Sequence, residues 1–291
     1  MGRLRLVGLS LAMLAPACAS TFSAKNKVAS SPSSASSADL VRISPQESFV
    51  WSVRWRGMRS GEIRTQVEAA PARGPRPTVV VRSQVGAKGF LSLFVRRQGK
   101  LITRMDRRTG LPVEVRDESM SPRGWSVTRA SCSPHLCRFA SAQEGEAPRN
   151  WVQPLPGGRM IHDLHSALAW LRAWDAERVR QASFLSVRGR RLYTVRVESH
   201  RSQRIRTPMG PRIAQLFELR GARLTPDLRI DPTQKPSTLR LWISVDDARL
   251  PLRFEAETRL GKVEAELTEY RAPRSDLRQW ASLAPISSSA R

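Results

Sequence analysis

Residues 239–267, with the sequence LRLWISVDDARLPLRFEAETRLGKVEAEL, decide the fold class of this chain. Apolar side chains recur at every second position on both sides of two short turns, at residues 246–248 and 261–262. A period of two is typical of strands with one buried and one solvated face. Because short turns join consecutive strands as antiparallel neighbours, this segment predicts a β-meander.

The same alternation begins near the N-terminus. Residues 49–55 place Phe, Trp, Val and Trp on one face of a strand and a more polar set on the other, and a turn at residues 57–61 leads into a second strand over residues 63–69. The pattern predicts a hairpin with one buried face. Further strand-like segments are predicted at residues 79–81, 101–105, 113–115, 184–187, 192–199 and 212–219.

One segment breaks the period of two. Residues 163–174 place Leu164, Leu168, Leu171 and Trp174 at helical spacing. His162 or Asp163 stands at the position of the N-cap. We therefore predict one main helix with a wide apolar face to bury.

The N-terminus has the order of an export signal. Arg3 and Arg5 precede an apolar run over residues 6–15 and then a small-residue segment, so residues 1–17 are predicted to be a signal peptide. The segment resembles a bacterial lipoprotein processing box, in which Cys18 becomes the lipid anchor. Ordinary cleavage at either of two A-x-A motifs, at residues 15–17 and 17–19, and an uncleaved anchor stay open, and the Ser-rich segment that follows favours the lipid anchor. We expect an outer-membrane lipoprotein facing the periplasm or a soluble periplasmic protein.

The rest of the chain divides by composition. Residues 18–40 are Ser-rich, poor in apolar side chains and without a periodic pattern, as expected of a flexible tether. Residues 41–272 carry the strand patterns and the helix, and we predict a single β-rich domain there. Residues 273–291 end in SSSAR and are predicted to form a flexible tail.

Positive charge dominates the chain. It has 49 Lys and Arg residues against 25 Asp and Glu, a net charge of +24, and only six of the basic residues are Lys. In a cytoplasmic protein this balance would indicate nucleic-acid binding. The export signal and the scattering of the basic residues argue against that partner. A solvated Arg-rich surface and attraction to anionic lipid headgroups or cell-wall polymers both remain open.

Two of the three cysteines lie close together in a strand-like region. Cys132 and Cys137 flank a short loop, so a disulfide is predicted to close the hairpin. With His135 they also form a C-x-x-H-x-C triplet, but a structural zinc site needs a fourth ligand and none lies nearby in the sequence. We therefore predict no metal site.

The sequence gives only weak evidence for catalytic residues. Asp246 and Asp247 are adjacent and are expected in a turn. His162 and His165 lie three apart, and we expect a helix start with one solvated and one packed histidine. Nucleophile motifs of the G-x-S-x-G kind and phosphate-binding glycine loops are absent from the sequence. We predict no catalytic residue, no cofactor and no enzymatic activity.

Several landmarks together resemble a known family. They are residues 47–53 (ESFVWSV), 89–91 (GFL), 104–106 (RMD), 109–112 (TGLP), 207–210 (TPMG), 241–254 (LWISVDDARLPLRF) and 260–263 (LGKV), together with the helix. Over about residues 46–272 the chain is similar to the bacterial exported family described as domain of unknown function 3108; the cysteine loop and the high Arg content are not part of that pattern. The resemblance implies an envelope location and a mainly β fold without an established reaction.

The resemblance also implies an architecture. It indicates an antiparallel, strongly curved sheet or open half-barrel with the segment 163–174 as the main covering helix, similar at the level of fold to lipoprotein-carrier half-barrels. Such a sheet could enclose a cavity for a lipid or another hydrophobic ligand. The candidate wall residues are Trp51, Trp55, Phe90, Phe94, Leu168, Leu171, Trp242 and Phe254.

A second function fits the same fold. If these side chains form an ordinary packed core, the protein is a tethered scaffold or interaction protein. It would then contact anionic cell-wall polymer, a membrane surface or another envelope protein through its basic outer face.

Overall fold

The computed structural model describes residues 41–70, 77–87, 98–121, 124–155, 157, 159–258 and 261–273. The predictions for the signal peptide, Cys18, the tether, Phe90, Phe94 and the tail after residue 273 lie outside these residues. The elements are β1 (Ser48–Trp55), β2 (Met58–Ala69), β3 (Thr78–Ala87), β4 (Gln98–Asp106), β5 (Pro112–Ser121), β6 (Gly124–Cys132), β7 (Leu136–Gln143), β8 (Glu146–Pro154), β9 (Ile161–His162), α2 (Leu164–Arg172), β10 (Gln181–Arg188), β11 (Arg191–Thr207), β12 (Gly210–Arg223), β13 (Ser237–Ser244), β14 (Pro251–Thr258) and β15 (Gly261–Arg271).

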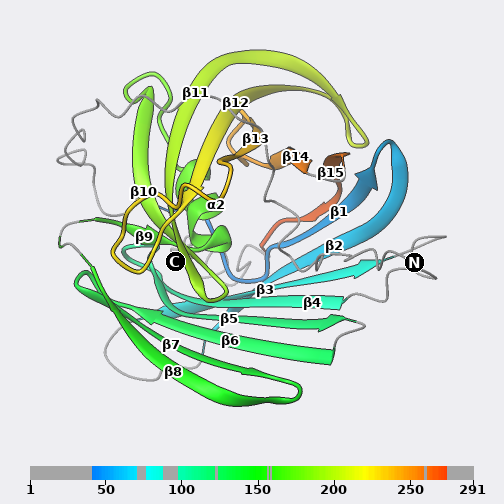
Figure 1. The fold of residues 1–291 in the computed structure, drawn as a ribbon. Coiled ribbons are helices and arrows are strands. Elements are labelled where there is room, and N and C mark those ends of the chain that lie inside the picture. Colours follow the sequence, from blue (N-terminus) through cyan, green and yellow to red (C-terminus); the bar gives the residue numbers. More distant parts are fainter. Residues whose placement is uncertain are drawn as a thin grey trace, which may run out of the picture.

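The described strands form one sheet of 15 strands in the order β8-β7-β6-β5-β4-β3-β2-β1-β15-β14-β13-β12-β11-β10-β9. The chain is therefore mainly β, as predicted, and β1 lies in the middle of the sheet beside β15. The sheet is strongly curved but not closed, with β8 and β9 at its two edges (Figure 1). All pairs are antiparallel except β9 with β10, which run parallel, so the expectation of a purely antiparallel sheet was too simple.

The sheet curves around α2 (Figure 1). Three hydrophobic clusters pack inside it, and the helix contributes to each: Ala169 to the first, Leu164 to the second, Ala167 and Leu171 to the third. The first cluster gathers β1 to β4 and β11 to β15, the second joins β4 to β8 with β9 to β11, and the third lies under β10 to β13. The helix therefore connects parts of the sheet that are far apart in strand order.

Asp163 fixes where the helix begins. Its carboxylate accepts hydrogen bonds from the backbone N–H groups of His165 and Ser166, and the Ser166 hydroxyl accepts one from the Asp163 N–H. This reciprocal capping box satisfies backbone donors that the first helical turn leaves unpaired. The predicted N-cap is confirmed at Asp163, and α2 ends at Arg172, within the expected segment.

A buried ion pair fixes the other end of the helix. Both terminal nitrogens of Arg172 donate to the Glu47 carboxylate, at 3.1 and 2.9 Å, and Tyr270 donates its hydroxyl to the same carboxylate at 3.0 Å. Arg172 also donates to the carbonyl oxygens of Ala248 and Arg249. The residue before β1, the end of α2, β15 and the β13–β14 turn therefore meet at one buried charge pair.

Candidate functional site

A row of hydroxyl side chains crosses the buried face of β2, β3 and β4. The Thr65 and Ser83 hydroxyls lie 2.5 Å apart, Ser83 Oγ lies 2.7 Å from His165 Nε2, and Thr103 Oγ1 lies 2.8 Å from His165 Nδ1. All four side chains are buried. The strand register places Thr65 opposite Ser83, so the sheet itself aligns the row under the first turn of α2.

Asp163 gives this row a direction. Thr103 donates its hydroxyl hydrogen to Asp163 Oδ2, because a carboxylate only accepts. Thr103 must then accept from His165 Nδ1–H. In a neutral ring Nε2 accepts the hydrogen of Ser83, whose oxygen accepts from Thr65, and the hydrogen bonds then run in one direction from Thr65 to Asp163.

Burial favours neutral histidines here. It lowers the pKa of His165, and the nearby Asp163 carboxylate opposes this only in part. Burial likewise lowers the pKa of His162 to about 4, with Asp163 again opposing. The rings of Trp170 and Phe184 pack against His162, at centroid distances of 5.5 and 5.1 Å. The expectation of one solvated histidine was therefore wrong, because both rings lie between the helix and the sheet.

The order hydroxyl, imidazole, carboxylate is the one that activates a serine nucleophile in acyl-transfer enzymes. Two features separate this row from such a site. Ser83 is buried against the helix, and Thr103 lies between the imidazole and the carboxylate, which are 3.8 Å apart. We therefore interpret the row as the polar contact that docks α2 on the sheet.

Sequence reasoning missed this row, although a signal was present. Thr65, Ser83 and Thr103 each occupy a buried-face position of the alternation, where the neighbours on the same face are Val67, Val81, Leu101 and Met105. A hydroxyl at such a position in three consecutive strands indicates a shared partner. Only the register and the docked helix identify that partner as His165.

The candidate wall residues that the structure describes lie in or against the hydrophobic clusters. Trp51 and Trp242 are buried in the first cluster, with Trp55 and Phe254 packed against it, while Leu171 is buried in the third and Leu168 packs against it. The structure therefore places all six side chains in or against hydrophobic clusters, although Trp242 lies on the face of β13 opposite Leu241 and Ile243. Their role as a ligand cavity stays a prediction.

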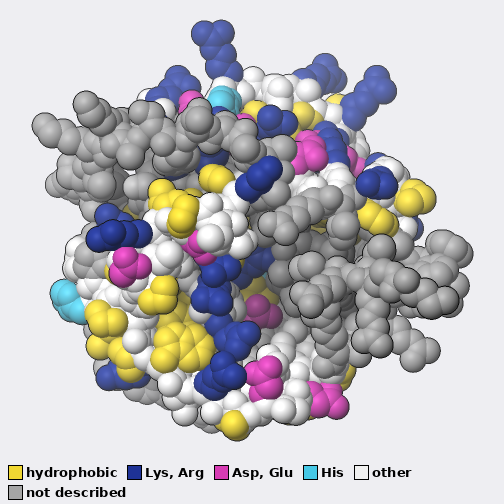
Figure 2. All heavy atoms as spheres, in the orientation of Figure 1, with side chains coloured by type: hydrophobic (Ala, Val, Ile, Leu, Met, Phe, Trp, Pro, Cys, Tyr) yellow, Lys and Arg dark blue, Asp and Glu magenta, His cyan; other side chains and the backbone are white. Residues whose placement is uncertain are grey.

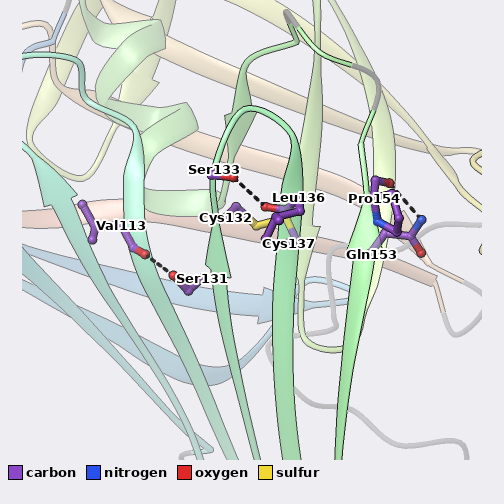
Figure 3. The surroundings of a disulfide bond; sticks show 8 residues. All are labelled: Val113, Ser131, Cys132, Ser133, Leu136, Cys137, Gln153 and Pro154. Carbon is purple, nitrogen blue, oxygen red and sulfur yellow. Dashed lines mark hydrogen bonds between the residues drawn. A yellow bond between two sulfur atoms is a disulfide. The ribbon is translucent and has the colours of Figure 1, made fainter.

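The disulfide lies at the turn between β6 and β7 (Figure 3). Cys132 and Cys137 are bonded across directly paired positions, with their Cα atoms 4.1 Å apart. The Ser133 hydroxyl and N–H both donate to the Leu136 carbonyl, so the enclosed loop is a tight turn. The predicted disulfide is thus present, and it engages both cysteines of the C-x-x-H-x-C triplet.

A groove of about 520 Å³ lies on the face of β4 to β8 that points away from the core. On that stretch Val115, Ala130 and Phe139 face the core, so the residues that alternate with them face outward. The outward side chains that line the groove are Arg104, Val113, Glu114, Arg129, Ser131, Arg138, Ala140, Asn150 and Val152.

The arginines of the groove differ in their partners. Arg104 is paired with Glu114 at 2.8 Å. Among the described residues, Arg129 and Arg138 have no side-chain ion pair or hydrogen bond, and both are exposed. On the face in view in Figure 2, Lys and Arg side chains lie beside hydrophobic ones in the lower part, where Figure 1 places β5 to β8. The groove therefore offers uncompensated positive charge next to apolar surface.

A family model for proteins of unknown function, DUF3108, matches residues 50–268. The chain belongs to the DUF3108 family. The resemblance found in the sequence is thereby confirmed. None of the curated proteins compared with this DUF3108 chain matches it.

Solved structures match this DUF3108 chain to different degrees. A β-barrel-like protein of domain of unknown function DUF1849 from Brucella abortus aligns with 81% of this chain and 99% of its own, at 9% identity and a TM-score of 0.50. A protein from Bacteroides fragilis, described as exported and as having a YmcC-like fold, aligns with 81% of this chain and 100% of its own, at 9% identity and a TM-score of 0.37. A protein from Parabacteroides distasonis, described as a lipoprotein, aligns with 78% of this chain and 96% of its own, at 11% identity and a TM-score of 0.31. The first likeness supports the fold alone.

Two further features are absent from the described part of the DUF3108 chain. It contains no helix with the length and apolar character needed to cross a membrane. It also contains no group of three or more His, Cys, Asp or Glu side chains placed to hold a metal ion.

Proposed function

We propose that this protein is a non-enzymatic binding protein of the cell envelope that contacts anionic envelope molecules through the outer face of β4 to β8. The observation that carries the proposal is the groove in which Arg129 and Arg138 lie beside exposed valines and have no side-chain partner in the part of the chain that the structure describes. The export signal and Cys18 support an envelope location, either as an outer-membrane lipoprotein facing the periplasm or as a soluble periplasmic protein.

The contrast between the two faces of the sheet supports this choice of site. The inner face carries three hydrophobic clusters and the hydrogen-bonded row that docks α2. The outer face of β4 to β8 instead exposes Arg129 and Arg138 without counter-charges among the described residues. Each basic residue close to an anionic membrane contributes about 1 kcal/mol of attraction, and guanidinium groups suit both phosphates and carboxylates.

Vesicle binding tests the proposal. The mature chain, residues 18–291 without a lipid anchor, is mixed at low ionic strength with vesicles of phosphatidylcholine alone or with added phosphatidylglycerol, and sedimented. We expect binding only to the anionic vesicles, falling as salt rises. The double reversal Arg129→Glu and Arg138→Glu should remove most of it.

A matched control uses the same change of charge elsewhere. Arg201 and Arg204 are exposed on β11, outside the groove, so Arg201→Glu with Arg204→Glu alters the net charge equally. We expect this variant to keep most of the binding. Equal loss in both variants would point to net charge alone, and absence of binding by the wild-type chain to anionic vesicles and to anionic cell-wall polymer would refute the proposal.

Lipid or other hydrophobic ligand binding inside the curved sheet is the second candidate. One buried ring nitrogen beside α2 favours it, because His162 Nε2 has no hydrogen-bond partner among the described residues. Native mass spectrometry of protein purified from its own envelope, followed by organic extraction, tests it. A stoichiometric lipid that is lost in a folded Leu168→Arg variant would support an interior site; an empty, stable wild-type protein would exclude one.

A further inference from the structure

We propose that the groove on β4 to β8 is a site for one anionic glycerophospholipid molecule, with the lipid phosphate between Arg129 and Arg138 and the glycerol and first acyl carbons against Val113 and Val152. This inference rests on the proposed function and adds the ligand class and the pose. It requires that the groove recognise a headgroup and a tail, not charge alone.

The head end of the site is built by two neighbouring strands. Arg129 of β6 lies opposite Ala140 of β7, and Arg138 lies two residues before Ala140 on the same face. Diagonal neighbours of this kind are separated by roughly 7–8 Å at the backbone, so two long side chains can converge on one phosphate. Guanidinium groups bind phosphate oxygens through paired N–H donors. The Glu114 carboxylate is engaged by Arg104 at 2.8 Å, so among the described residues no counter-charge remains for Arg129 and Arg138.

The apolar end lies directly beside these charges. Val152 of β8 is opposite Arg138 in the register and is 57% exposed. Val113 is 37% exposed, and it faces outward because a β-bulge at the β4–β5 pairing adds one residue to β5 at this point. The Ser131 hydroxyl donates to the Val113 carbonyl and so holds the bulged segment against β6.

Two features favour a lipid over a polymer of sugars or phosphates. A hydrophilic polymer would gain nothing from covering two exposed valines, whereas an amphiphile buries them. The groove volume of about 520 Å³ lies within the range of roughly 300–1,000 Å³ that is typical of sites for single small molecules. A headgroup with its glycerol fits this volume, and the acyl chains extend beyond it.

The test uses a phospholipid that stays monomeric. Dihexanoyl phosphatidylglycerol, below its micellar concentration, is titrated into the mature chain and followed by isothermal calorimetry. We expect saturable binding of one molecule. Glycerol phosphate should bind at least tenfold more weakly, and dihexanoyl phosphatidylcholine should also bind more weakly because its headgroup carries no net charge.

Three variants assign the two ends of the site. Arg129→Gln with Arg138→Gln should weaken the binding of dihexanoyl phosphatidylglycerol at least tenfold. Val152→Ser should weaken it severalfold and leave the binding of glycerol phosphate unchanged. Arg201→Gln with Arg204→Gln, the control on β11, should bind as the wild type does, and thermal unfolding checks that each variant is folded.

The outcomes separate this inference from the proposed function. If the wild-type chain binds anionic vesicles through Arg129 and Arg138 but does not bind the monomeric lipid with one-to-one saturation, the inference fails and the proposed function stands. Equal affinity for the lipid and for glycerol phosphate would also overturn it, because the valines would then contribute nothing. If the wild-type chain binds neither anionic vesicles, nor anionic cell-wall polymer, nor the monomeric lipid, both fail.

Discussion

The two parts of the sheet use the same residue type in opposite ways. Around α2, Arg172 is buried and both terminal nitrogens of its guanidinium group donate to the Glu47 carboxylate. On the wing formed by β6 to β8, Arg138 is exposed and has no partner among the described residues. Charge inside the curve therefore fixes the structure, while charge on the wing is left available for a ligand.

Packing shows the same contrast. The last four residues of β13 are all buried, whereas β8 has seven exposed and two half-buried residues. The wing still touches the core through Phe139 and Trp151, which stack with ring centroids 4.9 Å apart. Substitutions around α2 should consequently affect folding, and substitutions on the outer face of the wing should affect binding.

The strongest test of this contrast replaces one arginine in each part. We expect Arg172→Met to lower the free energy of unfolding by about 3–5 kcal/mol, because it leaves the Glu47 carboxylate buried without its partner. The same replacement at Arg138 should change it by less than about 0.5 kcal/mol. Urea unfolding measures both values, and an Arg172→Met protein as stable as the wild type would contradict the assigned role. Combining Arg172→Met with Glu47→Met should restore part of the loss.

Acid should weaken the part around α2 selectively. Burial lowers the pKa of His162 from 6.5 to about 4 in the folded state. Between these two pH values the unfolded state therefore binds a proton that the folded state does not bind. Stability is therefore highest above about pH 6.5 and falls as the pH drops toward 4, by about 3 kcal/mol for this group.

Unfolding midpoints between pH 4 and 8 measure this dependence. His162→Phe keeps an aromatic ring beside Trp170 and should make the midpoint fall less steeply with acid, with His165 supplying the remaining dependence. His135→Phe, on the exposed loop of the wing, is the matched control and should leave the slope unchanged. Equal slopes in both variants would exclude His162 as the source.

Removing one hydroxyl from the buried row should have a smaller effect. Thr103→Val leaves His165 Nδ1 without its hydrogen-bond partner and leaves Asp163 Oδ2 with only the backbone N–H of His165, so we expect a loss of about 1–3 kcal/mol in urea unfolding. Thr128→Val on β6 is the control, because no side-chain hydrogen bond of Thr128 is present among the described residues. A Thr103→Val protein as stable as the Thr128→Val protein would show that the row does not hold the helix.

The smallest expected effect comes from the wing. Replacing Cys132 and Cys137 together by Ser opens a link between residues only five positions apart, so we expect a loss of at most about 2 kcal/mol. Hydrogen exchange should become faster in β6 and β7 and stay unchanged in β13. Loss of protection across the whole sheet would instead mean that the wing and the part around α2 unfold as one unit.

The sequence predicts the strands whose two faces differ. The hairpin of β1 and β2 and the meander of β13 to β15 were predicted because apolar and polar residues alternate there, and the turn at Asp246 and Asp247 is confirmed. β8 was missed because its residues are nearly all exposed and include Pro148, so no buried face marks it. An edge strand with one weak contact face leaves little periodic signal.

The candidate sites show a second limit. The disulfide was predictable because both cysteines lie within one hairpin. The groove and the buried row combine residues from several strands, and the β-bulge that turns Val113 outward cannot be read from its neighbours. Which polar side chains meet depends on register and on where α2 docks, and neither is a local property of the chain.

The position of β1 in the middle of the sheet has a consequence for folding. The Thr268 hydroxyl donates to the carbonyl of Val50, two residues 218 positions apart, and β15 covers the edge of β1 that β2 does not. During synthesis β1 to β8 can pair in chain order, but this edge of β1 waits for almost the whole chain. Such distant pairing slows folding, and until it forms the unpaired backbone edge of this largely apolar strand can pair with other chains. The pairing of β15 with β1, at the centre of the sheet, is therefore the last to form. A chain that lacks β15 would keep an unpaired edge on β1, which is prone to aggregate.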